Sequence, residues 1–557
     1  MKRKNILMMG CLAGLLLLNA CSSEENMADT GNKIDVAKGI RFQFTEEGFE
    51  PGEVAAAKQG TRALAEPQEI DLGNGIIAEA TLEPDTAGCL QTRAGNPVPD
   101  GTYKIYAIDA GGTRHDGLTG TMTGGVFTPS GHWELEAGTY TFVCINSAVT
   151  DNGNELYVKL NHEDGMPLIG VSDPVTVTNP FDVFVSFVMR HQQARIRFQF
   201  VSYTEPIESP LIHWINCDQT FDVGSAYFDL KGNRLRNGGT NAGIFYPSGV
   251  LHLNQPYQPS SITKEYTYTT DYILCSPEFT NVTYYAIGGT LYGRTLWSNK
   301  SFLLGTFQKN HSYIWKLKFK NKDPWYLYND GTIGSLAKRG SRTPIGIVVK
   351  EKTSESDQGT ACALEDASLT AFWEDPAKTG LAAETQRNQT VYADLYSGQN
   401  DLNGYNWTWD ANSTTDHVVR ANEQEKYPAF YAAGHYRPSF TTVTGANVGK
   451  WYLPAIGEVL QLFKKFTPVN LSSSMGWSGI VSAIDKSKYR KLENAFTNVG
   501  NTIYLNSFFW TSTTADANDY HKYGPVAYNL MTSVYEPGTY VFMKNIHNIH
   551  VIPFVHF

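Results

Sequence analysis

The chain has 557 residues, of which 13% are aromatic and only 18% are charged, with 50 glycines and 25 prolines. This length allows about three domains, and an aromatic, turn-rich composition favours β-sandwiches over helical bundles. The formal net charge is −10, and it becomes −13 when the three cations at residues 2 to 4 are left out of the count. Such an acidic chain is not expected to bind nucleic acid.

The first residues predict export and a lipid anchor. Basic residues 2 to 4 precede an apolar stretch of about 15 residues, from 6 to 20, which is short for a membrane span and typical of a signal peptide. It ends in residues 18 to 21 (LNAC), which resemble a bacterial lipobox and imply cleavage before Cys21 and its acylation; an ordinary secretory peptide with a chance cysteine is the alternative. Residues 22 to 25 (SSEE) resemble the tag that directs Bacteroides-like lipoproteins to the outer face of the outer membrane.

Neither an enzyme nor a cofactor is expected. The sequence shows no Ser/His/Asp set, phosphate loop or H-E-x-x-H zinc motif. The cysteines beyond the leader are scattered and lack C-x-x-C spacing, which argues against a disulfide framework or zinc site. These cysteines are Cys89, Cys144, Cys217, Cys275 and Cys362. Cys144 and Cys275 lie in strand-like segments and are predicted to be small apolar core residues.

Metal binding is not expected either. His547 and His550 are an odd number of positions apart and would face opposite sides of a strand. Carboxylate and amide oxygens between residues 401 and 412 are of the type that binds calcium, but their spacing matches no calcium motif. A solvated loop is the expected structure there.

The sequence of the first part of the chain indicates a tether followed by a β-sandwich. Residues 22 to 36 are polar and form the tether, and residues 37 to 182 form the first sandwich, after the leader of residues 1 to 21. Residues 40 to 44 alternate apolar and polar as a half-buried strand does. Further strands are expected at 75 to 81, 101 to 108, 139 to 145 and 156 to 160, in an antiparallel arrangement.

Residues 183 to 322 predict a second antiparallel sandwich. The stretch from 183 to 201 is extended and is interpreted as the link between the two sandwiches. Residues 313 to 319 alternate clearly, and Asp323-Pro324 then marks a boundary.

Residues 323 to 557 predict an α+β domain. One helix is expected from Pro454, with the buried stripe Ile456, Val459, Leu460, Phe463 and Phe466; a second carries Tyr489, Leu492, Phe496 and Val499 and is capped by Gly500. Early in the first helix, the negative charge of Glu458 is explained by the helix dipole. Strands are predicted at 345 to 349, 508 to 511 and 550 to 557.

Several short segments resemble fimbrillin-like pilus subunits of Bacteroides and relatives. They are residues 61 to 63 (TRA), 92 to 94 (TRA), 99 to 106 (PDGTYKIY) and 310 to 317 (NHSYIWKL), together with the lipobox. The resemblance implies proteolysis after Arg62, or less favourably after Arg93, which removes a first strand carrying Ile40, Phe42 and Phe44. A strand of another subunit would then fill the groove.

The C-terminal region resembles lectin-like modules related in shape to C-type lectins and the sulfatase-modifying enzyme fold. The matching segments are 330 to 332 (DGT), 344 to 348 (PIGIV), 451 to 454 (WYLP), 457 to 458 (GE) and 509 to 513 (FWTST). Trp451 and Trp510 are expected to anchor the core of this domain. Enzymes of the related fold use a cysteine pair, whereas Cys362 has no apparent partner, so their activity is not expected.

These features favour a surface-exposed fimbrial subunit, a tip adhesin, that accepts a strand and presents the lectin-like domain. Because residues 550 to 557 are expected inside their own domain, they would not be donated. The ligand, a host or bacterial surface molecule such as a glycan, is expected to meet Tyr405, Trp407, Trp409 and Asp410; packing of these aromatics inside the domain is the alternative. Other pilus subunits and the outer membrane are the expected partners. The competing hypothesis is a stand-alone surface lipoprotein that binds glycans without polymerising.

Overall fold

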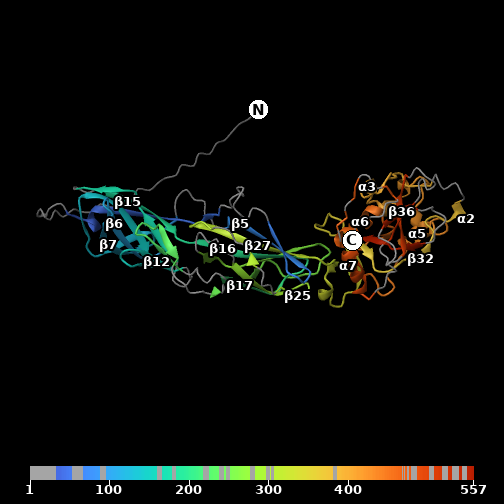
Figure 1. Cartoon of the computed structure of the whole chain (residues 1–557), viewed down its shortest axis with the longest axis horizontal. Coiled ribbons are helices and arrows are strands. Elements are labelled where there is room, and N and C mark those ends of the chain that lie inside the picture. Colours follow the sequence, from blue (N-terminus) through green and yellow to red (C-terminus); the bar gives the residue numbers. More distant parts are fainter. Residues whose placement is uncertain are drawn as a thin grey trace, which may run out of the picture. The chain divides into compact units, whose positions relative to one another are not determined.

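The computed structural model is mainly β-structure (Figure 1). It describes residues 33–52, 67–87, 96–159, 166–178, 183–216, 225–237, 244–245, 251–275, 283–296, 301–302, 307–379, 386–466, 468–469, 471–472, 476–477, 486–500, 507–516, 525–529, 538–541 and 549–557. The chain divides into two compact units. Unit 1 takes in Met1–Thr45, Pro97–Ile145 and Gly170–Val188, and unit 2 takes in Glu46–Asn96, Asn146–Ile169 and Met189–Phe557.

Unit 1 is built on one large sheet, in which β2 forms one edge and β8 the other. In order across the sheet, its strands are β2 (Ile40–Glu47), β15 (Val183–His191), β13 (Leu168–Val171), β10 (Gly138–Asn146), β6 (Gly101–Asp109), β7 (Arg114–Thr123) and β8 (Val126–Ser130). Strand β14 (Val175–Val177) pairs with β10, β1 (Lys33–Asp35) pairs with β9 (Glu134–Glu136), and α1 (Val36–Gly39) precedes β2. The predicted core role of Cys144 is confirmed, since its side chain is fully buried in β10.

The first sheet of unit 2 departs from the predicted antiparallel arrangement. Its order is β21 (His252–Leu253), β22 (Glu265–Thr269), β16 (Ala194–Tyr203), β27 (His311–Asn321), β5 (Ile76–Pro84) and β4 (Gln68–Asp71), with β23 (Ile273–Cys275) on β16 and β3 (Glu50–Pro51) on β27. The two central strands, β16 and β27, run parallel. The sheet is therefore mixed.

The placement of β5 also differs from the sequence prediction, which put residues 75 to 81 in the first sandwich. Strand β5 instead pairs antiparallel with β27 along its whole length, from Ile76 opposite Asn321 to Pro84 opposite Tyr313. Alternation of apolar residues predicts which face of a strand is buried, but it does not predict the neighbouring strand. The predicted link from 183 to 201 is two strands, β15 and β16, separated at Gln192 and Gln193.

Two smaller sheets complete this part of unit 2. One has the order β11 (Val149–Asp151), β12 (Leu156–Lys159), β18 (Ser225–Phe228) and β19 (Arg234–Asn237). The other has the order β20 (Ile244–Phe245), β17 (Glu208–Asn216), β24 (Thr283–Leu291) and β25 (Arg294–Thr295), with β26 (Ser301–Phe302) on β24.

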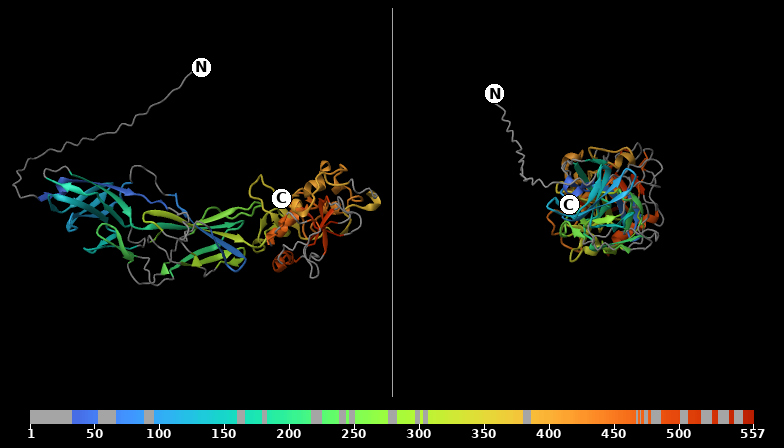
Figure 2. Two further views of the ribbon diagram at one scale, coloured as in Figure 1. Left: turned by 45° about the horizontal axis from the view of Figure 1, so that its top comes forward. Right: turned by 90° about the vertical axis from the view of Figure 1, so that its left-hand side faces the viewer.

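The C-terminal part of unit 2 combines two sheets with most of the helical ribbon (Figure 2). One sheet has the order β29 (Ile333–Gly334), β28 (Tyr326–Tyr328), β30 (Pro344–Lys350), β31 (Thr360–Ala363), β38 (Phe554–His556) and β33 (Trp451–Tyr452). The other has the order β32 (Ser368–Ala371), β37 (Ile549–Val551), β34 (Phe508–Thr514), β35 (Pro525–Asn529) and β36 (Gly538–Val541). The helices are α2 (Pro376–Thr379), α3 (Leu395–Gly398), α4 (Gly404–Trp409), α5 (Pro428–Gly434), α6 (Ile456–Phe466) and α7 (Lys486–Thr497), with short 3-10 turns η2 (Leu336–Lys338), η3 (Ala411–Ser413) and η4 (Arg420–Asn422).

The predicted helices and core tryptophans of this part are confirmed. The whole predicted apolar stripe of α6 is buried, although the helix begins at Ile456 and not at Pro454. Helix α7 ends at Thr497, so Val499 and Gly500 lie beyond its end; the φ of 82° at Gly500 suits glycine. Trp451 is 6% exposed and Trp510 is fully buried. Within the described residues, no helix is both long and apolar enough to cross a membrane.

The C-terminal strand lies inside its own domain, as predicted. It is two short strands, β37 and β38, because Pro553 between them has no N–H to donate to a ladder. Strand β38 is paired on both sides, by β31 and by β33. Phe554 and Val555 are fully buried, and Phe557 is 4% exposed.

Candidate functional site

A cavity of about 400 Å³ lies in the C-terminal part of unit 2, at the segment predicted to meet a ligand. It is lined by Lys350, Gln358, Thr360, Leu402, Asn403, Tyr405, Asn406, Glu458, Gln461 and His556. These residues come from β30, β31, α4, α6, β38 and the loops between them. Small-ligand sites have volumes of this order, roughly 300–1,000 Å³.

Asp401 shapes the loop that forms one side of the cavity. Its carboxylate is fully buried and accepts hydrogen bonds from Trp407 Nε1 at 2.9 Å and from Thr513 Oγ1 at 2.7 Å. The backbone N–H of Asn403 also donates to it, at 3.2 Å. Burial raises the pKa of Asp401, while these hydrogen bonds lower it. Asp401 is therefore occupied in holding the start of α4, and among the described residues no group of three His, Cys, Asp or Glu side chains is placed to bind a metal ion.

Two glycines allow the elements around the cavity to approach closely. A Cβ at Gly404 would collide with the Glu458 carboxyl group, and a Cβ at Gly457 would collide with the backbone oxygen of Asp401. Only glycine permits this separation between α6 and the segment leading into α4. The Gly457-Glu458 pair therefore marks the place where the two elements meet.

Glu458 forms the back wall of the cavity with two partners. Its Oε1 lies 2.7 Å from Tyr452 Oη, its Oε2 accepts the backbone N–H of Ala455 at 2.8 Å, and Tyr452 Oη lies 3.0 Å from His556 Nε2. Burial raises the pKa of Glu458 to about 8 and lowers the pKa of His556 to about 4. At neutral pH both groups are therefore mainly uncharged.

This result corrects the interpretation of Glu458 from the sequence. The residue does lie in the first turn of α6, but it is 4% exposed. A carboxyl group that is largely protonated contributes little to the helix dipole. Its role is to complete the wall of the cavity through the bond to Tyr452.

Tyr405 is the aromatic residue on the cavity wall. Its side chain is half-buried, with its ring centroid 5.3 Å from the ring of His556 and 5.7 Å from that of Tyr452. The nearby cation of Lys350 is paired, since Nζ lies 2.8 Å from Asp357 Oδ1 and 3.0 Å from the backbone oxygen of Gln358. The cavity thus combines the rings of Tyr405 and His556 with mainly uncharged hydrogen-bonding groups.

The other residues predicted to meet a ligand lie elsewhere. Trp407 is 4% exposed and belongs to the core, as the packing alternative expects. Trp409 is half-buried; its Nε1 donates to the Trp451 backbone oxygen at 2.8 Å, and Lys450 Nζ lies 4.3 Å from its ring centroid. Asp410 is exposed and caps η3 by accepting from a backbone N–H.

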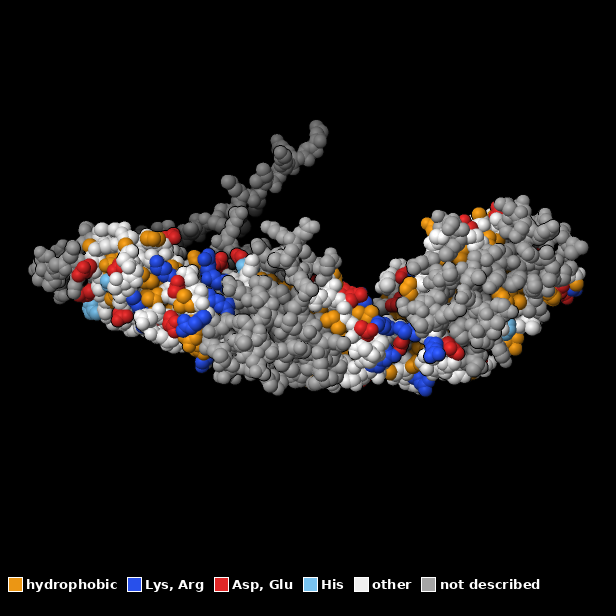
Figure 3. Space-filling model, in the orientation of Figure 1, with side chains coloured by type: hydrophobic (Ala, Val, Ile, Leu, Met, Phe, Trp, Pro, Cys, Tyr) orange, Lys and Arg blue, Asp and Glu red, His pale blue; other side chains and the backbone are white. Residues whose placement is uncertain are grey.

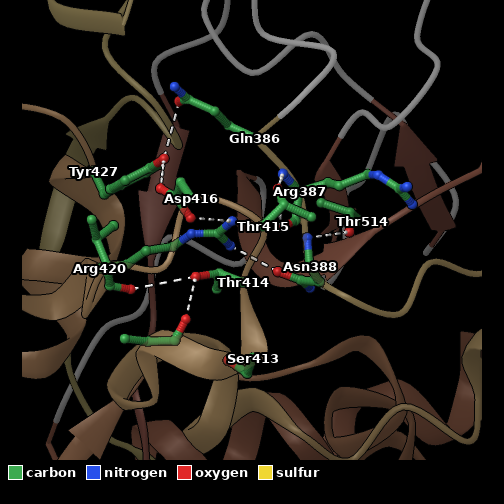
Figure 4. Close-up of polar contacts among 12 residues, drawn as sticks. Gln386, Arg387, Asn388, Ser413, Thr414, Thr415, Asp416, Arg420, Tyr427 and Thr514 are labelled. Carbon is green, nitrogen blue, oxygen red and sulfur yellow. Dashed lines mark hydrogen bonds and ion pairs between the residues drawn. The ribbon is translucent and has the colours of Figure 1, made fainter.

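A buried arginine joins the segments around residues 388 and 416 (Figure 4). Arg420 is fully buried; it donates to Asn388 Oδ1 at 2.7 Å, and its Nη2 lies 3.7 Å from Asp416 Oδ1. Its guanidinium carbon lies 4.8 Å from the ring centroid of Trp373. Tyr427 donates to Asp416 as well. Nothing in the local sequence distinguishes this arginine from a surface residue, so it was missed.

The predicted removable strand is the edge strand β2 of unit 1. Ile40 is buried, and Phe42 and Phe44 are half-buried. The rings of Phe42 and Phe44 stack on Phe187 at centroid distances of 5.9 and 5.3 Å, and both contact Phe127 edge-on or tilted. A cavity of about 550 Å³ lies beside this strand. Cys21, Arg62 and Arg93 lie outside the described residues.

Ion pairs lie on the surface of unit 2. Lys322 Nζ lies 2.6 Å from Asp71 Oδ2, and Arg294 pairs with Asp323. On the face shown in Figure 3, basic and acidic side chains accordingly lie beside one another in the coloured regions.

Comparison with solved structures finds similarity to fimbrial proteins. The chain is similar to a fimbrial protein from Bacteroides ovatus ATCC 8483 over 93% of its own length and 99% of the other chain, with 11% identity and a TM-score of 0.25. It is similar to the fimbrial anchor protein Mfa2 from Porphyromonas gingivalis over 39% of its length and 78% of that chain, with 12% identity and a TM-score of 0.25. No family model and no curated protein matches the sequence.

Proposed function

We propose that this chain is an exported, lipid-anchored subunit of a surface fibre, and that its C-terminal part binds a ligand at the outer end of that fibre. The role is binding and not catalysis, and it needs no cofactor. The observation that carries the proposal is the contrast between two strands. Strand β2 lies at the edge of its sheet, whereas β38 is paired on both sides and buried.

Strand β2 is suited to replacement by a strand from another subunit. Its loss would leave the hydrogen-bonding groups of β15 unpaired and would uncover Phe127 and Phe187. An incoming strand with aromatic residues at alternate positions would restore both the main-chain bonds and the ring contacts. Strand β38 cannot be donated in return, because its release would break the sheet between β31 and β33.

The anchor is tested by Cys21→Ser. The variant loses the acylation site, so it should move from the membrane fraction to the soluble fraction or accumulate as unprocessed precursor. Cys11→Ser, within the apolar stretch of the leader, is the matched control and should fractionate as wild type. If Cys21→Ser remains in the membrane fraction with normal processing, the anchor is excluded.

Processing is tested by Arg62→Ala. Mass spectrometry of native fibres should detect an N-terminus at Ala63 in wild type and none in the variant, and the variant should assemble poorly because β2 stays in its groove. Arg93→Ala serves as the comparison for the less favoured site. Normal assembly of the Arg62→Ala variant, with no N-terminus near Ala63, would refute strand removal.

A stand-alone surface lipoprotein is the second candidate. It is favoured by one observation: the cavity is lined entirely by residues from 350 to 556 and needs no other subunit to be complete. Purification of the native protein separates the two. A fibre subunit remains in high-molecular-weight assemblies, and a stand-alone lipoprotein is recovered as a monomer.

A further inference from the structure

The chemistry of the cavity points to one class of ligand. Its wall offers a half-buried aromatic ring, Tyr405, beside side chains that both donate and accept hydrogen bonds. These polar side chains are Gln358, Thr360, Asn403, Asn406 and Gln461. An amide group can donate and accept at once, as each hydroxyl group of a sugar does.

We propose that this cavity is a calcium-independent binding site for a neutral saccharide, in which a sugar ring packs on Tyr405 and its hydroxyl groups bond to Asn406 and Gln461. The inference deepens the proposed binding role of the C-terminal part and rests on it. The aliphatic hydrogens of a sugar ring carry partial positive charge and face the negative surface of an aromatic ring. The amides then fix the orientation of the ring.

The charges around the cavity argue against an acidic or a strongly basic ligand. Among the described residues of its wall, the one cation is Lys350. It is paired with Asp357, so its attraction for an anionic ligand is reduced. The one carboxyl group, Glu458, is bonded to Tyr452 and to a backbone N–H, and it is mainly protonated at neutral pH. Neither group is free to pair with an ionised ligand.

A bound metal ion is not needed for this recognition. Asp401, a buried carboxylate at the start of the segment that leads into α4, already accepts bonds from Trp407 and Thr513. Calcium requires several free oxygen ligands, and among the described residues that line the cavity only Glu458 carries a carboxyl group. Saccharide binding should therefore persist in a chelator.

The test uses the full chain on an immobilised panel of neutral and acidic oligosaccharides, followed by calorimetry with the best neutral sugar, with and without EDTA. Tyr405→Ala should weaken binding by about tenfold, the equivalent of about 1.4 kcal/mol. Tyr405→Phe keeps the ring and should retain most of the affinity. Tyr396→Ala removes an exposed tyrosine outside the cavity and is the matched control.

A second variant tests the same site in case Tyr405→Ala does not fold. Asn406 is exposed, so Asn406→Ala should fold normally and weaken binding by about fivefold through the loss of a hydrogen bond; Asn412→Ala is its control. Binding only to acidic sugars, binding abolished by EDTA, or no binding to any neutral sugar each overturns the inference. A chain that binds neutral sugars but never enters fibres would refute the proposed fibre role and leave the saccharide site standing. A chain that enters fibres but binds no neutral sugar would refute the saccharide site and leave the fibre role standing.

Discussion

The buried carboxyl group of Glu458 makes the C-terminal part sensitive to pH. Its folded-state pKa of about 8 lies above the ordinary value of 4.5, chiefly because burial disfavours the charged form, and Asp401 raises it further. The other titratable groups nearby are Tyr452, His556 and Lys350. A raised carboxyl pKa stabilises the fold fully below about pH 4.5, and this stabilisation is lost as the pH rises toward about 8.

Glu458→Gln tests this statement. Across the window from pH 4.5 to 8, the free energy of unfolding of wild type should fall relative to the variant, by up to about 1.4 kcal/mol per pH unit, the slope for one proton. Denaturant unfolding at several pH values measures the difference. Glu425→Gln, at an exposed position, is the control, and a wild-type curve parallel to that of Glu458→Gln would contradict the assignment.

Arg420 should be important for stability and not for binding. Arg420→Met leaves the buried Asn388 side chain without its donor and removes the positive charge beside Asp416, which keeps its hydrogen bond from Tyr427, so it should lower the free energy of unfolding by about 3 kcal/mol. Arg437→Met, at an exposed position, should change it by less than about 0.5 kcal/mol. Denaturant unfolding followed by tryptophan fluorescence measures both, and equal midpoints for the two variants would refute the role.

At the scale of elements, the close approach of α6 to residues 399 to 401 depends on the absence of a Cβ at Gly457. Gly457→Ala places a Cβ against the backbone of residues 399 and 401, and overpacking of this kind costs about 1–3 kcal/mol. The thermal midpoint should fall and saccharide binding should weaken, because α6 carries both Glu458 and Gln461. Gly476→Ala, where a Cβ meets open space, is the control; a Gly457→Ala protein with normal stability and binding would contradict the close packing.

The edge strand β2 gives a second prediction for an element. Phe42→Ala removes a half-buried ring that contacts Phe127, Phe142 and Phe187, and it should destabilise the edge by about 1–2 kcal/mol. Backbone amides of β2 and β15 should then exchange hydrogen faster, while those of β6 and β7 should not. Phe184→Ala, at a position that is 56% exposed, is the control and should leave hydrogen exchange unchanged. Unchanged exchange in Phe42→Ala would show that the aromatic contacts do not stabilise β2.

The sequence predicted local features of these elements better than distant ones. Helices α6 and α7 were predictable because their apolar spacing is repeated within a single segment. The pairing of β5 with β27 joins segments more than 200 residues apart, and alternation contains no information about that partner. The parallel pairing of β16 with β27 was missed for the same reason.

The same distinction applies to the cavity. Tyr405 was predicted because its segment is rich in aromatic and turn residues, although the segment forms α4 and not the expected solvated loop. Gln358, Gln461 and His556 come from distant segments and were not predicted. Trp407 lies two positions after Tyr405 on α4, and helix residues at that spacing do not share a face. One ring therefore lines the cavity while the other enters the core.

At the scale of the whole molecule, strand acceptance and ligand binding are assigned to different units. Unit 1 carries the edge strand β2 with its aromatic rings. Unit 2 carries the cavity and the doubly paired strand β38. A chain that can accept a strand but cannot release β38 ends the growth of a fibre, and this is why the proposed position is the outer end.

Immunogold electron microscopy of isolated fibres, with antibodies against residues 325 to 557, tests this position most directly. We expect label at one end of each fibre and none along the shaft. Label spread along the shaft, or fibres without label in cells that produce the chain, would contradict it.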